Sequence, residues 1–197
     1  SEAGTITYLK CLMIRNTKVS DISFLSGMQD LEELWANNCP ISDLSCLSGK
    51  TKLYRIHLGN DKNEGRISDI SCLSAASGLY WLEARGNRIS DISCLRGKTK
   101  LMHLDLDNNS ISDLSPLSQC RSLERVFLKN NKITSAAPLA KLTTIESLYL
   151  QNNRISDVAP LAGLTNLKNL YLSGNPVSDY SALRAIYPKL KGKDFTL

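Results

Sequence analysis

An apolar anchor recurs along the chain at a nearly constant interval of 22 residues. Every step between successive anchors has this length, apart from one step of 26 residues. The anchors are six leucines and one isoleucine, at Leu31, Leu53, Leu79, Leu101, Leu123, Ile145 and Leu167. A period of this length, kept across almost the whole chain, predicts a stack of similar units.

Each unit carries the same string of apolar and polar positions. In the unit that begins at Leu123, Val126 and Leu128 follow three and five residues later, and Asn131 follows after eight. This is the leucine-rich-repeat spacing L-x-x-L-x-L-x-x-N, and eight copies fit it, the first anchored at Leu9. The alternation of the second and third apolar positions predicts a short strand with both side chains on its buried face.

The segments between the strands carry two further signals. An asparagine column follows the strands, at Asn87, Asn109, Asn131, Asn153 and Asn175. A buried amide at such a turn is expected to bond backbone groups of its own turn and of the next one. Further along, Ser115 before Pro116 predicts an N-cap with proline at the first helical position, and therefore a short helical or 3₁₀ turn.

These signals together predict an α/β solenoid, because one unit cannot bury its own apolar edge and the units must stack in register. We expect a curved, right-handed leucine-rich-repeat superhelix with a parallel β-sheet on its concave side and short 3₁₀ or helical turns on its convex side. Residues 1–197 are expected to form a single domain of about eight repeats. Residues 184–197 are expected to cap its C-terminal end, and an N-terminal cap is expected to be missing.

The units resemble a known class of repeats. With Ile-Ser-Asp-Ile-Ser or Ala-Pro-Leu after the asparagine, they resemble the internalin-like and SDS22-like leucine-rich repeats, and residues 158–167 are especially similar to internalins. Internalins are surface-anchored or secreted proteins with which some Gram-positive bacteria engage host receptors, whereas SDS22-like proteins are intracellular and bind a phosphatase. Both resemblances imply a non-catalytic scaffold that grips a partner in its concave sheet. Lys50 and Lys98 depart from the pattern, since Leu142 and Leu164 occupy their place later.

The residues between the strand leucines should point out of the sheet and so define the concave surface. Aromatic side chains there bury large areas and lose little entropy, which makes them frequent interface hot spots. The expected partner-binding residues are Trp35, His57, Trp81, Glu83, His103, Asp105, Phe127, Tyr149 and Tyr171. Two alternatives remain open: these rings stack across the strands and merely stiffen the sheet, or they form a self-association patch.

The signals for other functions of this surface are weaker. Charges on adjacent strands, such as Glu33 and Arg55, are expected mostly to pair with one another. His57, Glu83 and Asp105 share one column, but their spacing is loose and an open sheet seldom supports ligands from behind, so no metal or cofactor is expected. An enzyme is not expected either, because no nucleophile with a positioned base is evident.

The one irregular step inserts 4 residues at the edge of the concave face. Such insertions are often functional, so we expect a partner-contacting loop. Its expected contact residues are Asn60, Asp61, Lys62, Asn63 and Glu64. Asp61 and Asn63 resemble the start of a calcium loop, but the later ligands are missing.

Composition further restricts the class of partner and the environment of the protein. The net charge is +5, but no stripe of lysine and arginine follows one strand face, so nucleic acid is not expected. No apolar run is long enough to enter a membrane. The six cysteines lack zinc spacing and are expected to be small apolar thiols in a reduced setting. A monomer is favoured over a dimer, and a bacterial cell-surface or secreted location over a cytoplasmic one.

Overall fold

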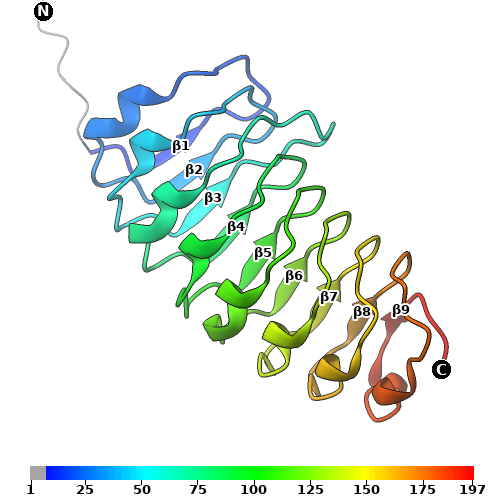
Figure 1. The fold of residues 1–197 in the computed structure, drawn as a ribbon. Coiled ribbons are helices and arrows are strands. Elements are labelled where there is room, and N and C mark those ends of the chain that lie inside the picture. Colours follow the sequence, from blue (N-terminus) through cyan, green and yellow to red (C-terminus); the bar gives the residue numbers. More distant parts are fainter. Residues whose placement is uncertain (1–7) are drawn as a thin grey trace, which may run out of the picture.

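A computed structural model describes residues 8–197, and residues 1–7 of the expected domain lie outside the described part. In this part, nine strands form one parallel sheet in which each strand lies beside the next in sequence (Figure 1). The strands are β1 (Cys11–Met13), β2 (Glu33–Trp35), β3 (Arg55–His57), β4 (Trp81–Glu83), β5 (His103–Asp105), β6 (Arg125–Phe127), β7 (Ser147–Tyr149), β8 (Asn169–Tyr171) and β9 (Gly192–Lys193). The expected curved solenoid is confirmed.

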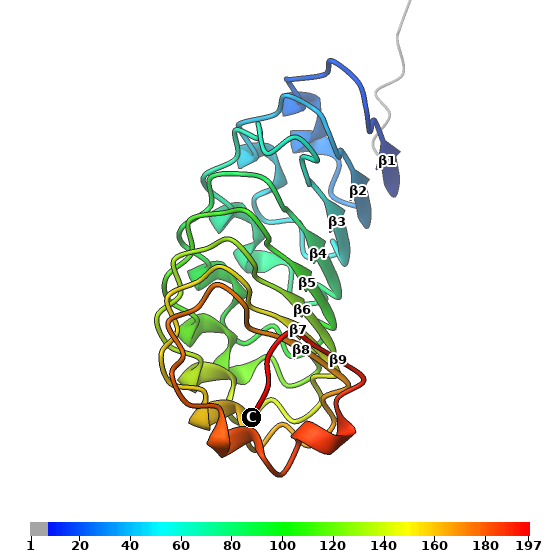
Figure 2. The ribbon, with the colours of Figure 1, turned by 90° about the vertical axis from the view of Figure 1, so that its right-hand side faces the viewer.

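Short 3₁₀ helices occupy the side opposite the sheet, as Figure 2 shows along the length of the stack. They are η1 (Ser23–Gly27), η2 (Ser45–Leu47), η3 (Ser71–Ala75), η4 (Ser93–Leu95), η5 (Ser115–Gln119), η6 (Ala137–Leu139), η7 (Ala159–Leu161), η8 (Ser181–Leu183) and η9 (Tyr187–Lys189). Every helix among the described residues is therefore of the 3₁₀ type. None of them has the length and apolar character needed to cross a membrane.

The repeat leucines and the asparagine column hold the stack together. Leu101, Leu104 and Leu106 are fully buried, as are their counterparts in the other inner repeats. The Asn131 amide donates to the carbonyls of Leu106, Leu128 and Lys129, at 2.9, 3.1 and 3.3 Å. Its Oδ1 accepts from the backbone amide of Ile111 at 2.9 Å. The predicted bonds to the asparagine's own turn are confirmed, but the second turn that it bonds is that of the preceding repeat and not the next one.

The prediction that Ser115 is an N-cap is wrong. Ser115 is the first residue of η5, and Asp113 Oδ1 accepts its backbone N–H at 2.8 Å. The same Asp-x-Ser bond recurs ahead of η1, η2, η3, η4 and η8. An aspartate can reach the backbone two residues on, so this side chain, and not the serine after it, organises the start of these turns. Ahead of η6 a serine, Ser135, takes the place of the aspartate.

The C-terminal segment, which we expect to cap the stack, adds a short strand after the eight predicted repeats. β9 pairs in parallel with β8, although its anchor, Leu190, comes 23 residues after Leu167. Asp194 accepts the backbone N–H of Leu172 at 2.7 Å, and Phe195 stacks on Tyr180 at 4.7 Å. Residues 184–197 thus add a ninth, shorter repeat to the sheet.

The structure explains the two lysines at leucine positions. Lys50 and Lys98 are almost completely buried, and the ammonium of each donates to a carbonyl of the preceding repeat. Lys50 Nζ reaches Met28 O at 2.8 Å, and Lys98 Nζ reaches Ser74 O at 2.6 Å. Burial lowers the pKa of both lysines. Each stem can fill the space of a leucine while its charged end replaces water with backbone oxygens.

Candidate interaction surface

Strict register aligns the outward-facing side chains of the sheet into columns. Glu33 pairs with Arg55, which pairs with Trp81, which pairs with His103. The second column, two residues further along each strand, runs through Trp35, His57, Glu83, Asp105, Phe127, Tyr149 and Tyr171. Both columns are those that the repeat spacing predicts.

Seven aromatic rings form one continuous stack across these columns, which we call the aromatic ladder. It consists of Trp35, His57, Trp81, His103, Phe127, Tyr149 and Tyr171. Within one column the centroids lie 3.7 to 4.9 Å apart and the planes differ by 9° to 12°. Where the ladder crosses between columns, the spacing widens to 5.8 and 5.4 Å. The rings turn their faces toward one another, so their edges point away from the sheet.

The polar centre of the surface is organised around Glu83. Its carboxylate accepts from His57 Nδ1 at 2.8 Å and from Asn37 Nδ2 at 3.0 Å, and Arg85 Nη1 lies 3.6 Å away. Arg85 Nη1 also lies 3.6 Å from Asp105 Oδ2. Burial alone would raise the pKa of Glu83, but the hydrogen bond from His57 and the charge of Arg85 bring that pKa below its usual value. Glu83 is therefore an anionic acceptor at neutral pH.

Two neighbours of this centre titrate unusually because they are buried. Burial raises the pKa of Asp105 to about 6, and the nearby carboxylate of Asp107 adds to the shift. Burial also lowers the pKa of His103 to about 4. At neutral pH the His103 ring is consequently uncharged, which suits its close stacking on Trp81.

Not all of the expected contact residues are open to a partner. His57 is only 5% exposed and Asp105 only 7%, because neighbouring rings and side chains cover them. The other expected residues, including Trp35 and Phe127, are partly exposed. His57 and Asp105 therefore support the surface from beneath. Among residues 8–197, no three histidine, cysteine or acidic side chains group as metal ligands would.

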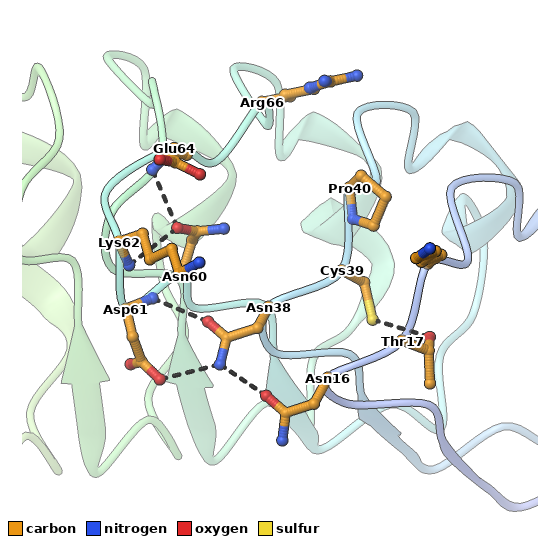
Figure 3. A pocket seen from close by; sticks show the side chains of 11 residues that line it. Asn16, Thr17, Asn38, Cys39, Pro40, Asn60, Asp61, Lys62, Glu64 and Arg66 are labelled. Atoms are coloured by element: carbon orange, nitrogen blue, oxygen red, sulfur yellow. Dashed lines mark hydrogen bonds between the residues drawn. The ribbon is translucent and has the colours of Figure 1, made fainter.

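The inserted loop lies beside this surface and is tied to it. Asp61 accepts from Arg85 Nη2 and from Asn38 Nδ2, at 2.5 and 2.9 Å. The Asp61 backbone N–H donates to Asn38 Oδ1 at 2.8 Å, and Asn60 Oδ1 accepts from the Glu64 backbone N–H at 2.9 Å (Figure 3). These contacts occupy Asp61 with protein groups and fix the loop to the concave centre.

The loop also encloses a polar pocket of about 530 Å³ with the two preceding repeats. The lining residues are Asn16, Thr17, Lys18, Asn38, Cys39, Pro40, Asn60, Asp61, Lys62, Glu64 and Arg66 (Figure 3). A smaller hollow of about 270 Å³ connects this side with Trp35, His57 and Glu83. Asn60, Asp61, Lys62 and Glu64 of the expected contact loop line the pocket, whereas Asn63 does not.

Sequence analysis missed a second asparagine column, which lies one residue before the buried one. Its members have a left-handed backbone, and their exposed amides bond across repeats, for example Asn130 to Asn108 at 2.6 Å and Asn152 to Asn130 at 2.7 Å. Gly86 replaces asparagine beneath the inserted loop, with φ at 68°, and a Cβ there would lie 2.0 Å from Asn60 O. The 22-residue recurrence of these asparagines is a signal that could have revealed the column.

Comparison with known proteins supports the same architecture. Residues 7–49, 99–141, 121–163 and 143–185, together more than half of the chain, match the family model for Leucine Rich repeats (2 copies). A search of curated proteins finds no match to the sequence. Many solved structures are similar to it, including two internalins from Listeria monocytogenes.

The similarity to these structures extends over nearly all of the chain. Internalin C2 (inlC2) is 30% identical with a TM-score of 0.86, and the match covers 95% of this chain and 80% of that one. The internalin inlF is 29% identical with a TM-score of 0.86, over 94% of this chain and 54% of that one, so this chain spans about half of its length. The leucine-rich-repeat ectodomain of the receptor kinase GASSHO1/SCHENGEN3 from Arabidopsis thaliana is 22% identical with a TM-score of 0.83, over 95% and 24%, and shows the fold alone.

Proposed function

Because the chain belongs to the leucine-rich-repeat family and to its internalin-like class, we propose that it is a non-catalytic recognition module whose concave face binds a protein or peptide. The observation that carries this proposal is the aromatic ladder. It places seven rings in succession across β2 to β8, in two adjacent columns on the side of the sheet that faces away from the core.

The ladder has the properties of a preorganised binding surface. Six of its rings, those of Trp35, Trp81, His103, Phe127, Tyr149 and Tyr171, are partly exposed. Each ring is already held by its stacked neighbours, so a partner has little side-chain entropy left to remove. Large aromatic side chains that are ordered before binding are the usual hot spots of protein interfaces.

The same fold binds a partner in another protein. The Arabidopsis receptor ectodomain was solved in complex with CASPARIAN STRIP INTEGRITY FACTOR 2. A scaffold of stacked repeats offers an extended surface for such contacts. For the present chain, we place the partner over the ladder, including His103, with Glu83 at the centre of the contact and residues 60–64 of the inserted loop at its margin.

We favour a bacterial cell-surface or secreted protein, on the strength of the 29–30% identity to two internalins. The second candidate is an intracellular SDS22-like scaffold or targeting domain of a larger regulatory protein. It is favoured by the six cysteines, all within the described residues and all free thiols, since reduced cysteines are typical of intracellular proteins. The full-length gene distinguishes the two: a signal peptide with a wall anchor favours the first, and a fused enzyme domain favours the second.

The test is capture of a partner by the folded domain from host-cell and own-cell lysates, with wild type compared with Phe127→Ala. Phe127 stacks on Tyr149 at 4.6 Å, so the substitution interrupts the ladder at its middle. We expect the variant to lose the captured protein while its melting temperature falls by only a few degrees, since one stacked pair contributes about 1 kcal/mol.

The matched control is Phe24→Ala, which removes the same side chain from η1, where Phe24 is 52% exposed. This control should capture the partner as wild type does. Equal capture by Phe127→Ala and wild type would refute binding over the ladder. Light scattering on the free domain should give a monomer, and a dimer disrupted by Phe127→Ala would make the ladder a self-association surface instead.

A further inference from the structure

On the concave face, the negatively charged side chains of the strands are more deeply buried than their positively charged partners. The carboxylate side chains of Glu33, Glu83, Asp105 and Asp107 are 20%, 14%, 9% and 5% exposed. Their cationic partners Arg55, Arg85 and Lys129 are 33%, 40% and 45% exposed. These four acids therefore lie beneath the surface that a partner would meet, and the cations form that surface. Asp61 of the inserted loop is the exception, since its side chain is 56% exposed and pairs with Arg85.

Each of these carboxylates is also occupied by groups of the sheet itself. Glu33 accepts from Tyr54 and from Trp35 Nε1. Asp107 Oδ1 accepts the backbone N–H of Lys129 at 2.8 Å, and its Oδ2 lies 3.2 Å from Lys129 Nζ. Since their hydrogen-bonding capacity is used internally, the acids offer little to a partner.

Two further cations on the same face are free. Arg15 and Arg125 are exposed, and neither forms an ion pair with any carboxylate of residues 8–197. Arg15 lies over the outer face of Trp35, 5.7 Å from the ring centroid. Arg125 is the register partner of His103 on the next strand. The ladder is thus flanked by positive charge from β1 to β6.

Five buried side-chain atoms lack a hydrogen-bond partner within residues 8–197, and two of them add to this imbalance. These two are Arg55 Nε and Trp81 Nε1, whose residues are register partners on β3 and β4; the others are His57 Nε2, His103 Nδ1 and Gln151 Oε1. Arg55 Nε and Trp81 Nε1 only donate hydrogen bonds, so only an acceptor can satisfy them. The outward edges of stacked aromatic rings are likewise the positive part of their quadrupole.

We propose that the partner segment bound on the concave face is acidic, an extended stretch rich in aspartate and glutamate that runs across the strands beside the aromatic ladder. This inference rests on the proposed function and specifies its ligand class. Five steps between strands, from β1 to β6, cover about 24 Å, which about seven extended residues span. Carboxylates along that stretch can meet Arg55 and Arg125 on one side of the ladder and Arg15, Arg85 and Lys129 on the other.

A single-stranded nucleic acid is the other polyanion to consider, and the ladder disfavours it. Such strands bind by stacking their bases on exposed aromatic faces. Here the faces of Trp81, His103, Phe127 and Tyr149 are turned toward neighbouring rings, at centroid spacings of 3.7 and 4.6 Å within each pair. A peptide needs only acceptors at the ring edges.

The test measures binding of three fluorescent peptides by anisotropy, each roughly twice the length of the proposed segment. One mixes glutamate and serine in irregular order, and the others carry glutamine or lysine in place of glutamate. We expect the glutamate peptide to bind at least about tenfold more tightly than either counterpart and to weaken as salt is added. Equal or tighter binding of the glutamine or lysine peptide overturns the proposal. So does tighter binding of an oligothymidine of equal charge.

A pair of double variants locates the binding. Arg15→Gln/Arg125→Gln removes two exposed charges that have no internal partner, and should weaken the glutamate peptide about fivefold. Lys132→Gln/Arg154→Gln makes the same change of charge in the exposed loops beyond the buried asparagines and should weaken it less than about twofold. Equal losses in the two double variants overturn the proposal. A partner captured through Phe127 whose contact segment is neutral or basic also overturns it, and leaves the proposed function standing.

Discussion

Replacing Asn131 with alanine tests how the repeats are held together. Asn131 is only 8% exposed, and its Oδ1 is the acceptor for the backbone N–H of Ile111. The alanine variant leaves that amide without an acceptor in a place that water does not reach. An orphaned buried amide costs about 1–3 kcal/mol.

The loss of free energy is smaller at the carbonyls that accept hydrogen bonds from Asn131. Leu106 O also accepts from the Asn109 amide, Leu128 O from the Asn153 amide, and Lys129 O from the backbone N–H of Asn108. Each of the three carbonyls therefore keeps one donor in the variant, and the loss is about 0.5 kcal/mol for each. Adding both effects, we expect Asn131→Ala to lower the free energy of unfolding by about 2.5–4.5 kcal/mol.

Urea unfolding followed by circular dichroism measures this loss, with two variants for comparison. Asn130→Gly removes the exposed neighbour, whose φ of 54° glycine tolerates, and should cost less than about 0.5 kcal/mol. Asn175→Ala should cost roughly half as much as Asn131→Ala, because Asn175 is only partly buried and water can replace its bonds. If Asn131→Ala costs no more than Asn130→Gly, the buried amides do not hold the repeats together.

Three further predictions concern buried titratable groups. Lys50→Leu removes an ammonium whose pKa is lowered by burial, so the folded wild type binds this proton less well than the unfolded chain does. Wild type should therefore gain stability relative to this variant as the pH rises toward 10.5. Urea unfolding at several pH values measures the difference. His103 has a pKa lowered to about 4, so wild type should lose about 1–3 kcal/mol of stability relative to His103→Gln as the pH falls from about 6.5 to about 4. A difference in stability between the two proteins that does not change with pH would contradict this. Burial raises the pKa of Cys72 to about 12, so iodoacetamide at pH 8 should alkylate this thiol at least roughly tenfold more slowly in the folded than in the unfolded protein. Mass spectrometry measures the two rates, and equal rates would mean that the thiol is accessible to solvent in the folded protein.

The arrangement of the strands could be predicted in detail because the period alone determines it. Once Trp35 and His57 are 22 residues apart in equivalent positions, parallel pairing in register must bring them side by side, and they stack at 3.8 Å. The late anchor at Leu190 hid β9, since a search at a constant step expects leucine one residue earlier. A single altered step was thus enough to conceal a strand.

The depth of side chains could not be predicted from the repeat. Glu83 and Arg85 are two residues apart in one strand segment, and the sequence counts them as opposite charges of equal weight. In the structure Glu83 turns down toward His57 and Asn37, while Arg85 stays 40% exposed and reaches Asp61 in the inserted loop. This difference depends on rotamers and on a loop contact 24 residues away in sequence, neither of which has a periodic signal.

The uniform register of the sheet also limits what kind of sequence can be recognised. Strands repeat about every 4.8 Å, whereas an extended partner presents side chains on one side about every 6.7 Å. These spacings coincide only after about seven steps from strand to strand, or about 34 Å. The aromatic ladder runs from β2 to β8, which is about 29 Å, so a partner that starts in step with a ring at one end is not in step again before the ladder ends. No regularly repeating ligand can then satisfy every ring, and discrimination between partners must come from a few unevenly spaced positions.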